Sequence, residues 1–306
     1  MGTIFVVQQV VVLAILMAVG YIATKKNIIN EDISRGMTQI LTNIALPALI
    51  ISSFDFGYSK DRIKGLVMIF IYSLIIHGLI IVISKIAFIK YKKGKNGVLS
   101  FGSIFPNSGF MGLPLVMELF GQEGVLYASV FMIPYHTLLW TYGEGLLSEK
   151  KKESALEKLT ISPALIAVAI GALIFILKIQ MPYVISKPLS MLSLLTSPLS
   201  MLILGEKIAK LKLKEIIGDR DIYYGCFIKL IISPLLTFLF LKIINAPQLL
   251  LGISVTMQAL PSAILLVVLT QKHDGEIDLA SKFAVVSHIV SIVTIPLIII
   301  GTGLLK

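Results

Sequence analysis

Long apolar runs alternate with short polar connections along all 306 residues of the chain. Each run is close to the roughly 20 residues that an α-helix needs to cross the hydrocarbon core of a bilayer. The first run has no basic residue before it and no clear cleavage site after it, so we expect a membrane helix there rather than a secretory signal. The pattern predicts an all-α integral membrane protein with ten transmembrane helices, at residues 3–24, 33–54, 64–89, 97–120, 124–147, 161–178, 183–206, 222–244, 248–270 and 279–304.

Composition supports this fold class. Hydrophobic residues make up 56% of the chain and charged residues only 14%, whereas soluble domains carry about 25% charged residues. The net charge of +10 does not indicate a nucleic-acid partner, because the lysines lie in short clusters between the apolar runs, as membrane topology requires. The single cysteine, Cys226, forms neither an intrachain disulfide nor a cysteine-based metal site, and we expect no cofactor.

The distribution of lysine and arginine predicts the orientation. Most of the 27 basic residues fall in the odd-numbered connections between the expected spans, and the termini and even-numbered connections hold few. Cytoplasmic loops carry the excess of basic residues in membrane proteins. We therefore expect a multi-pass protein of the cell membrane with both termini on the extracytoplasmic side.

An internal repeat divides the chain. Gly20 and Pro47 are separated by the same 27 positions as Gly171 and Pro198. The fifth and tenth spans carry similar segments that end in a proline, at residues 129–134 and 291–296. Five spans per copy is an odd number, so the second copy enters the membrane from the opposite side, as an inverted repeat. We expect repeats at residues 1–150 and 151–306, joined by the basic stretch at 150–158.

Two apolar segments in corresponding places of the halves are interrupted by proline, at residues 105–114 and 257–262. Proline lacks an N–H and disfavours helix in the residue before it, so Pro106, Pro114 and Pro261 are expected to break helices 4 and 9. Such breaks persist at membrane depth only where they line a polar cavity or are buried in protein. Paired breaks in two halves indicate the substrate site of a transporter.

The chemistry expected at the two breaks favours an anion. A half-helix that starts at each break has unpaired N–H groups and the positive end of a helix dipole. Neutral side chains add hydrogen-bond donors, and glycine permits close approach of the backbone. We expect a small carboxylate to be bound by Asn107, Ser108, Gly109, Gln258, Ser262 and, from the second span, Asn43.

Ionisable residues inside the expected spans are candidates for proton coupling, because a charge at membrane depth is costly. These candidates are His77, His136 and Lys229. A second interpretation stays open for each of them: a buried histidine can be neutral and hydrogen-bonded, and Lys229 can extend its ammonium group to the cytoplasmic surface.

Residues 103–114 resemble the fourth-helix motif of the auxin efflux carrier family, within the bile acid/arsenite/riboflavin transporter-like superfamily. Residues 46–50 resemble its second helix and residues 258–262 its ninth. The short central connection resembles bacterial members. The family's crossover asparagine falls on Asn107, and its second-half counterpart falls on Gln258, where asparagine is more typical.

This resemblance implies a sodium/proton antiporter-like fold, with a scaffold of helices 1, 2, 6 and 7 and a transport domain of helices 3–5 and 8–10. It implies an elevator mechanism and substrates such as auxin or malate-like and malonate-like acids. Sodium dependence is not implied. Dimerisation through the scaffold helices stays open.

The leading hypothesis is a secondary carrier of small organic anions that works by alternating access, and not an enzyme. A cation/proton antiporter on the same fold would need paired carboxylates at the crossing, and residues 100–115 and 252–265 contain none. A channel or membrane sensor would need charged pore rings or a soluble output domain. The sequence offers neither.

Overall fold

The computed structural model describes residues 2–55, 59–148, 162–210 and 219–304. Within these residues the secondary structure is helical, and extended pairing is confined to one bridge between Pro106 and Ser262. The basic stretch at 150–158, and with it the expected boundary between the repeats, lies outside the described residues. The all-helical class predicted from the apolar pattern is confirmed.

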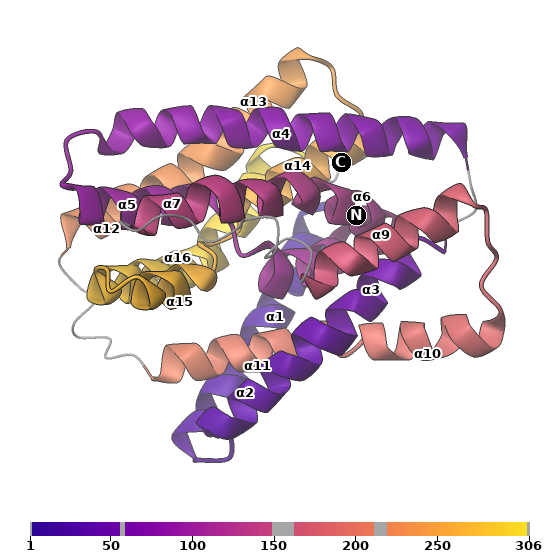
Figure 1. Ribbon diagram of the computed structural model, residues 1–306, viewed down its shortest axis with the longest axis horizontal. Coiled ribbons are helices and arrows are strands. Elements are labelled where there is room, and N and C mark those ends of the chain that lie inside the picture. Colours follow the sequence, from indigo (N-terminus) through magenta and orange to yellow (C-terminus); the bar gives the residue numbers. More distant parts are fainter. Residues whose placement is uncertain (1, 56–58, 149–161, 211–218, 305–306) are drawn as a thin grey trace.

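The described part of the first half contains seven α-helices (Figure 1). They are α1 (Gly2–Lys25), α2 (Glu31–Ile40), α3 (Leu46–Ser53), α4 (Lys60–Phe88), α5 (Lys93–Ile104), α6 (Leu113–Leu138) and α7 (Glu144–Leu147). Side-chain oxygens of Asn30 and Ser59 accept from backbone N–H groups in the first turns of α2 and α4. These caps fix where the two helices begin.

The described part of the second half contains eight α-helices. They are α9 (Pro163–Ile176), α10 (Tyr183–Ser193), α11 (Thr196–Ala209), α12 (Arg220–Phe227), α13 (Ser233–Ile243), α14 (Gln248–Ala259), α15 (Leu265–Lys272) and α16 (Ile277–Gly301).

Short π-helical turns join several of these helices into longer runs. Three of them, η1 (Leu41–Ala45), η2 (Ser108–Gly112) and η5 (Ile228–Ile232), each lead into a helix with proline in its first turn. Proline cannot donate the helical hydrogen bond, and the extra residue of a π turn absorbs that mismatch. Pro114, expected within a break, therefore lies inside a continuous helical run at the start of α6.

Seven described helical runs are long and apolar enough to cross a membrane. They are Val7–Lys25, Glu31–Ser53, Lys60–Phe88, Ser108–Leu147, Tyr183–Ala209, Arg220–Ile243 and Ile277–Gly301. The run Ser108–Leu147 contains 40 residues and changes direction at Gly121, where φ is +65°. Large apolar side chains are exposed on α1, α4 and α10, as lipid-facing helices require. The chain is a multi-pass membrane protein by these criteria.

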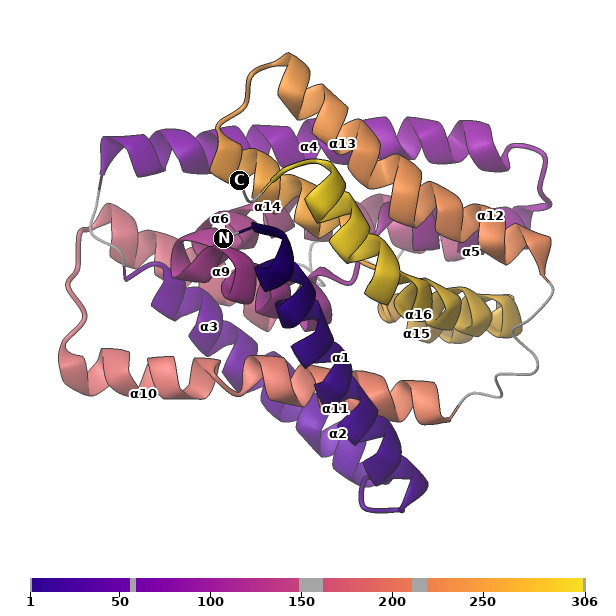
Figure 2. The ribbon, with the colours of Figure 1, turned by 180° about the vertical axis from the view of Figure 1, so that it is seen from behind.

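Glycine contacts bring two pairs of helices to close range. A Cβ atom at Gly20 of α1 would lie 2.4 Å from the carbonyl oxygen of Leu202 in α11, and one at Gly205 would lie 2.1 Å from that of Met17. Figure 2 shows α1 crossing α11 at this place. On the other side, a Cβ at Gly171 of α9 would lie 2.3 Å from the ring of Phe54, directly after α3. Small residues at such crossings let membrane helices pack backbone to backbone.

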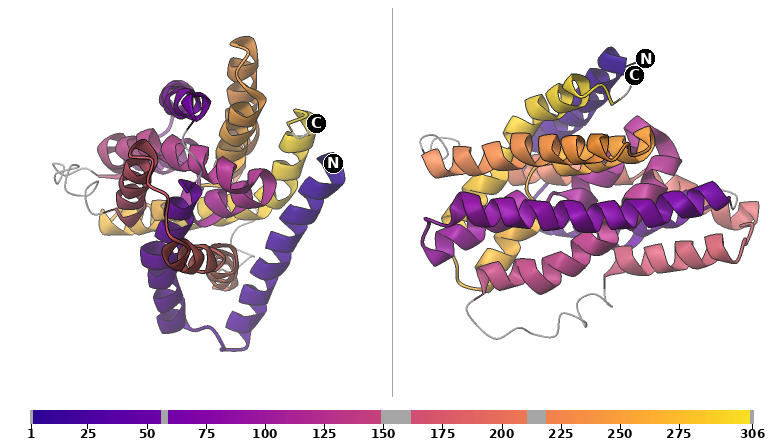
Figure 3. Two further views of the ribbon diagram at one scale, coloured as in Figure 1. Left: turned by 90° about the vertical axis from the view of Figure 1, so that its right-hand side faces the viewer. Right: turned by 90° about the horizontal axis from the view of Figure 1, so that it is seen from above.

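A second packing centre holds the opposite part of the molecule together. The ring of Phe283 in α16 occupies the space that a Cβ would need at Gly102 of α5 and at Gly225 of α12. The long helix α4 packs on both α6 and α5. The start of α1 and the end of α16 lie close together in both views of Figure 3.

The α1–α11 crossing generates the first prediction. Gly205→Ala should lower the thermal unfolding midpoint of the detergent-purified protein, since overpacking at a tight contact costs about 1–3 kcal/mol. The matched control is Gly78→Ala in α4, where an added Cβ meets nothing within 4 Å. That control should be neutral or stabilising, because alanine favours helix over glycine. Equal midpoints for the two variants would contradict backbone-to-backbone packing at Gly205.

Candidate functional site

The two helix breaks cross and hydrogen-bond to each other. One break, at residues 105–107, separates α5 from η2, and the other, at 260–264, separates α14 from α15. The N–H of Asn107 donates to the carbonyl oxygen of Pro261 at 2.8 Å, and the N–H of Ala263 donates to that of Phe105 at 2.9 Å. This short antiparallel bridge satisfies backbone groups that the prolines release from helical bonding.

The crossing requires close approach at one further place. A Cβ at Gly112, in η2, would lie 2.8 Å from the side chain of Leu260 and 3.1 Å from the sulfur of Met257. Glycine at this position therefore lets the half-helix after the first break pack against the residues before the second break.

Both half-helices begin with backbone N–H groups that have no acceptor. In the described part of the chain, no hydrogen bond is donated by the backbone N–H of Gly109, Phe110, Ile264 or Leu265. All four residues line one pocket. Free N–H groups at helix starts form a site for negative charge.

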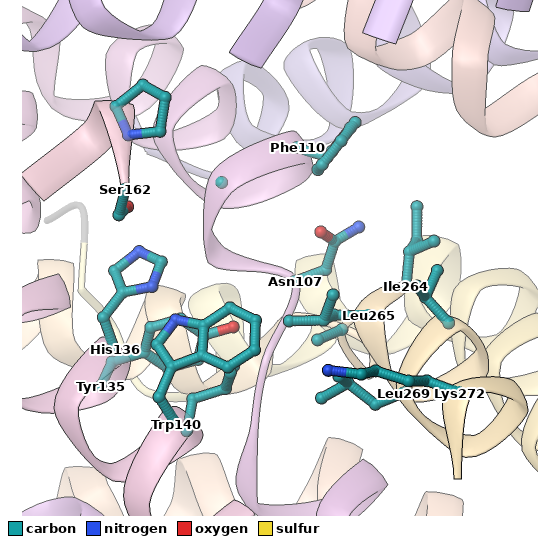
Figure 4. Close-up of a pocket in the computed structure, with 15 residues that line it drawn as sticks. Asn107, Phe110, Tyr135, His136, Trp140, Ser162, Ile264, Leu265, Leu269 and Lys272 are labelled. Carbon is teal, nitrogen blue, oxygen red and sulfur yellow. The ribbon is translucent and has the colours of Figure 1, made fainter. Parts of the chain in front are cut away.

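We call this cavity the crossing pocket; its volume is about 590 Å³ (Figure 4). Most of its lining is apolar, from α15, η3 (Leu139–Gly143) and the start of α9. Six side chains bring polar atoms to it: Asn107, Tyr135, His136, Trp140, Ser162 and Lys272. An apolar lining with a few convergent polar groups is typical of a small-molecule site.

The side chain of Asn107 is held by a histidine that lies 181 positions further along the chain. Its amide nitrogen lies 3.0 Å from Nε2 of His288 in α16, and Nδ1 of His288 lies 2.6 Å from the carbonyl oxygen of Ala284. A carbonyl oxygen only accepts, so Nδ1 carries a proton and Nε2 of the neutral ring accepts from Asn107. Both side chains are almost fully buried.

Gln258 belongs to a second amide–imidazole pair, which does not line the crossing pocket. Its amide nitrogen lies 3.5 Å from Nε2 of His77, whose Nδ1 lies 2.7 Å from the carbonyl oxygen of Ser73. The ammonium group of Lys229 donates to the backbone oxygen of Gln258 at 3.4 Å, and the Lys229 side chain is fully buried. The structure thus brings Gln258, His77 and Lys229 together and places none of them in the crossing pocket.

Of the remaining residues expected at the site, some lie at the crossing and one lies away from it. His136 lines the crossing pocket, and its Nε2 has no hydrogen-bond partner among the described residues. Ser108 and Ser262 are fully buried at the breaks, and the N–H of Ser262 donates to Oγ of Ser287 at 3.2 Å. Asn43, expected to face the crossing, is exposed on η1 and donates to the backbone oxygen of Gln39.

Sequence reasoning missed three side chains at this site. His288 and Trp140 lie in long apolar runs, and a histidine at membrane depth is itself a sufficient signal. Lys272 falls in a connection between two expected spans, where a basic residue indicates orientation rather than binding. In the structure it lines the pocket and lies 3.9 Å from the carboxylate of Glu144, which also lies 3.2 Å from Nε2 of His273.

Apolar helices that are broken at a polar crossing recur in membrane transport proteins. The profile of the membrane transport protein family matches residues 5–159 and 150–299. The chain belongs to this family, the auxin efflux carrier family, which confirms the resemblance found in the sequence.

Two archaeal relatives are similar over almost their whole length. An uncharacterized transporter of Methanocaldococcus jannaschii is 26% identical over 301 residues, which cover 94% of this chain and 96% of that protein. An uncharacterized transporter of Methanothermobacter thermautotrophicus is 28% identical over 305 residues, or 97% of each chain. Both names agree with a role in transport.

The Asn107–His288 contact generates the second prediction. Asn107→Leu removes the donor to a buried ring nitrogen, and an unsatisfied buried acceptor costs about 1–3 kcal/mol. The thermal unfolding midpoint in detergent should fall accordingly. The control is Asn43→Leu, the same substitution at an exposed position, with an expected change within about 0.5 kcal/mol. Similar losses for the two variants would show that the contact contributes nothing specific.

Proposed function

We propose that this protein is a secondary carrier that moves small organic anions across the cell membrane by alternating access. The observation that carries the proposal is the crossing pocket. Four backbone N–H groups without acceptors and the ammonium group of Lys272 belong to its lining, and none of its described lining residues is an aspartate or glutamate. The positive ends of two half-helices favour a carboxylate over a cation there.

The apolar part of the lining supports an organic substrate. Phe110, Leu139 and Trp140 line the crossing pocket beside the polar groups. The pocket volume of about 590 Å³ lies in the range of small-molecule sites. A carboxylate at the helix starts and a hydrocarbon body against these side chains would use both kinds of surface.

Ten transmembrane segments in two inverted repeats form the proposed architecture. Gly20 and Gly171, which occupy equivalent places in the two sequence repeats, make corresponding contacts: the first with α11, the second with the residue that follows α3. The two hydrogen bonds of the crossing relate the breaks by an approximate two-fold. Adjacent chain ends agree with an even number of crossings (Figures 2 and 3).

The proposed scaffold comprises α1–α3 and α9–α11, and the proposed transport domain comprises α4–α7 and α12–α16. Packing of α1 on α11 and of α9 and α10 on α3 supports the first group. Packing of Phe283 against Gly102 and Gly225 supports the second. Rocking or sliding of one group against the other would open the crossing to alternate sides.

The positive-inside bias places both termini outside in this proposal. Lys272, which lines the crossing pocket, belongs to an odd-numbered connection on the basic side, and Ser162 lies at the start of the sixth expected span, directly after another such connection. The pocket therefore extends toward the side proposed to be cytoplasmic, and the described conformation corresponds to an inward-facing carrier.

The third prediction tests the substrate class. The purified protein in proteoliposomes is challenged with malate, malonate, indole-3-acetate and sodium while charge movement is recorded. We expect currents with at least one acid. Lys272→Gln should raise the half-saturating concentration about tenfold, which corresponds to about 1.4 kcal/mol. Lys242→Gln, at an exposed position on α13 outside the pocket, is the matched control and should leave it unchanged.

Silence to every acid would contradict the proposal. A response to sodium or to a pH step under that condition would favour the cation/proton antiporter instead. Equal effects of Lys272→Gln and Lys242→Gln would place the anion site away from the crossing pocket.

A further inference from the structure

Hydrogen-bond chemistry at Asn107 links a proton to the anion site. Because Nδ1 of His288 donates to the backbone oxygen of Ala284, the neutral ring offers only a lone pair at Nε2. The amide nitrogen of Asn107 must then face His288, and the amide oxygen must face away from it. In Figure 4 that oxygen lies on the side of His136 and the nitrogen on the side of Ile264.

With this orientation Asn107 presents an acceptor to the crossing pocket. A carboxylate also only accepts, so the two oxygens would repel each other. The free backbone N–H groups and Lys272 attract the anion, while the Asn107 oxygen opposes it. While His288 is neutral, the Asn107 amide therefore disfavours binding of the anion.

Adding a proton to His288 reverses this arrangement. Nε2 becomes a donor, while Nδ1 keeps its bond to Ala284. The Asn107 amide must rotate by half a turn so that its oxygen accepts from Nε2. Its NH₂ group then faces the crossing pocket and can donate to a carboxylate. The proton binds at Nε2 of His288, and no covalent bond between heavy atoms changes.

A second pocket provides a separate approach to His288. Its volume is about 310 Å³, and His288 lines it together with Lys207, Lys210 and Gln271. Ile264 and Val268 line both pockets, so side chains of the α15 segment lie between the two. A proton could reach Nε2 through the second pocket while the anion occupies the crossing pocket.

Charges around His288 explain why the proton would not stay without the anion. Lys207 and Lys210 face the second pocket, and both are ion-paired with buried Glu206, which raises the pKa of Lys210 and keeps it protonated, so this carboxylate already has its partners. Lys272 on α15 lies 3.9 Å from Glu144, and Lys95 on α5 is paired with Asp221 of α12, while buried Lys229 on η5 has no acidic partner among the described residues. No described residue that lines either pocket is an aspartate or glutamate. An imidazolium here gains its counter-charge from the bound anion, so each ligand strengthens binding of the other.

We propose that His288 and Asn107 form a proton-operated switch that couples entry of one proton to binding of one organic anion. This inference rests on the proposed carrier function. It names His288 instead of the expected candidates His77, His136 and Lys229. His77 and Lys229 contact Gln258 outside the crossing pocket, and His136 makes no hydrogen bond to Asn107 in the described structure.

The fourth prediction is tested on the full chain in proteoliposomes that contain a pH indicator. Malate and malonate exchange reports anion movement, and internal acidification during net uptake reports proton movement. His288→Gln keeps a hydrogen-bonding partner for Asn107 but does not titrate, so we expect exchange to persist while proton movement falls at least about tenfold. The control is His77→Gln, which changes the His77–Gln258 pair outside the crossing pocket. This variant should retain proton movement.

A measurement on the unmodified protein covers the case in which His288→Gln does not fold. Calorimetry in buffers of different ionisation heat counts the protons taken up on binding of malonate. We expect net proton uptake on binding, with at most one proton per anion, and an affinity that rises up to about tenfold for each unit of falling pH. Binding without proton uptake overturns the switch, as does wild-type proton movement in His288→Gln. Absence of binding and of exchange for every acid overturns the carrier function itself.

Discussion

Backbone hydrogen bonding at the two helix breaks is the constraint on which this structure depends. Pro106 and Pro261 each interrupt a helix at a depth where lipid offers no hydrogen-bond partners. The chain meets this by pairing the breaks with each other through Asn107 and Ala263. The same step leaves the N–H groups of the two half-helix starts unpaired beside a pocket. One local arrangement thus satisfies the backbone at both breaks and also forms a binding surface. Each break depends on the other for its hydrogen-bond partners.

Two amide–imidazole pairs extend this dependence from the backbone to the side chains. Asn107 of the first half contacts His288 of the second, and Gln258 of the second half contacts His77 of the first. In each pair the histidine is anchored by a carbonyl oxygen four residues earlier in its own helix. Each half of the chain therefore fixes the side-chain orientation at the break of the other half. The two pairs differ in one respect: only Asn107 lines the crossing pocket.

The sequence was sufficient for the helical class, for the transporter family and for the breaks at Pro106 and Pro261, because proline and hydrophobic length act locally. It also predicted a break at Pro114, which lies inside a continuous helical run. It was insufficient for the side-chain contacts. Asn107 and His288 are 181 positions apart, so only the packing of α16 against the crossing brings them together. Gln258 was paired with Asn107 by analogy, yet it precedes its break and Asn107 follows its own. Their side chains contact different histidines, and only that of Asn107 lines the crossing pocket. Asn43 was expected to face inward, but the π turn η1 leaves it exposed.

Gly121 has a consequence for how the crossing could move. Its positive φ turns the chain directly from the half-helix after the first break into the remainder of α6, without a loop between them. The half-helix begins beside Asn107, and the helix after the turn carries Tyr135 and His136 to the same pocket. A turn this short has little slack, so a displacement at one end reaches the other almost undiminished. The half-helix beside Asn107 and the part of α6 that carries Tyr135 and His136 would then move together. The geometry between these two parts of the pocket would stay the same for any ligand.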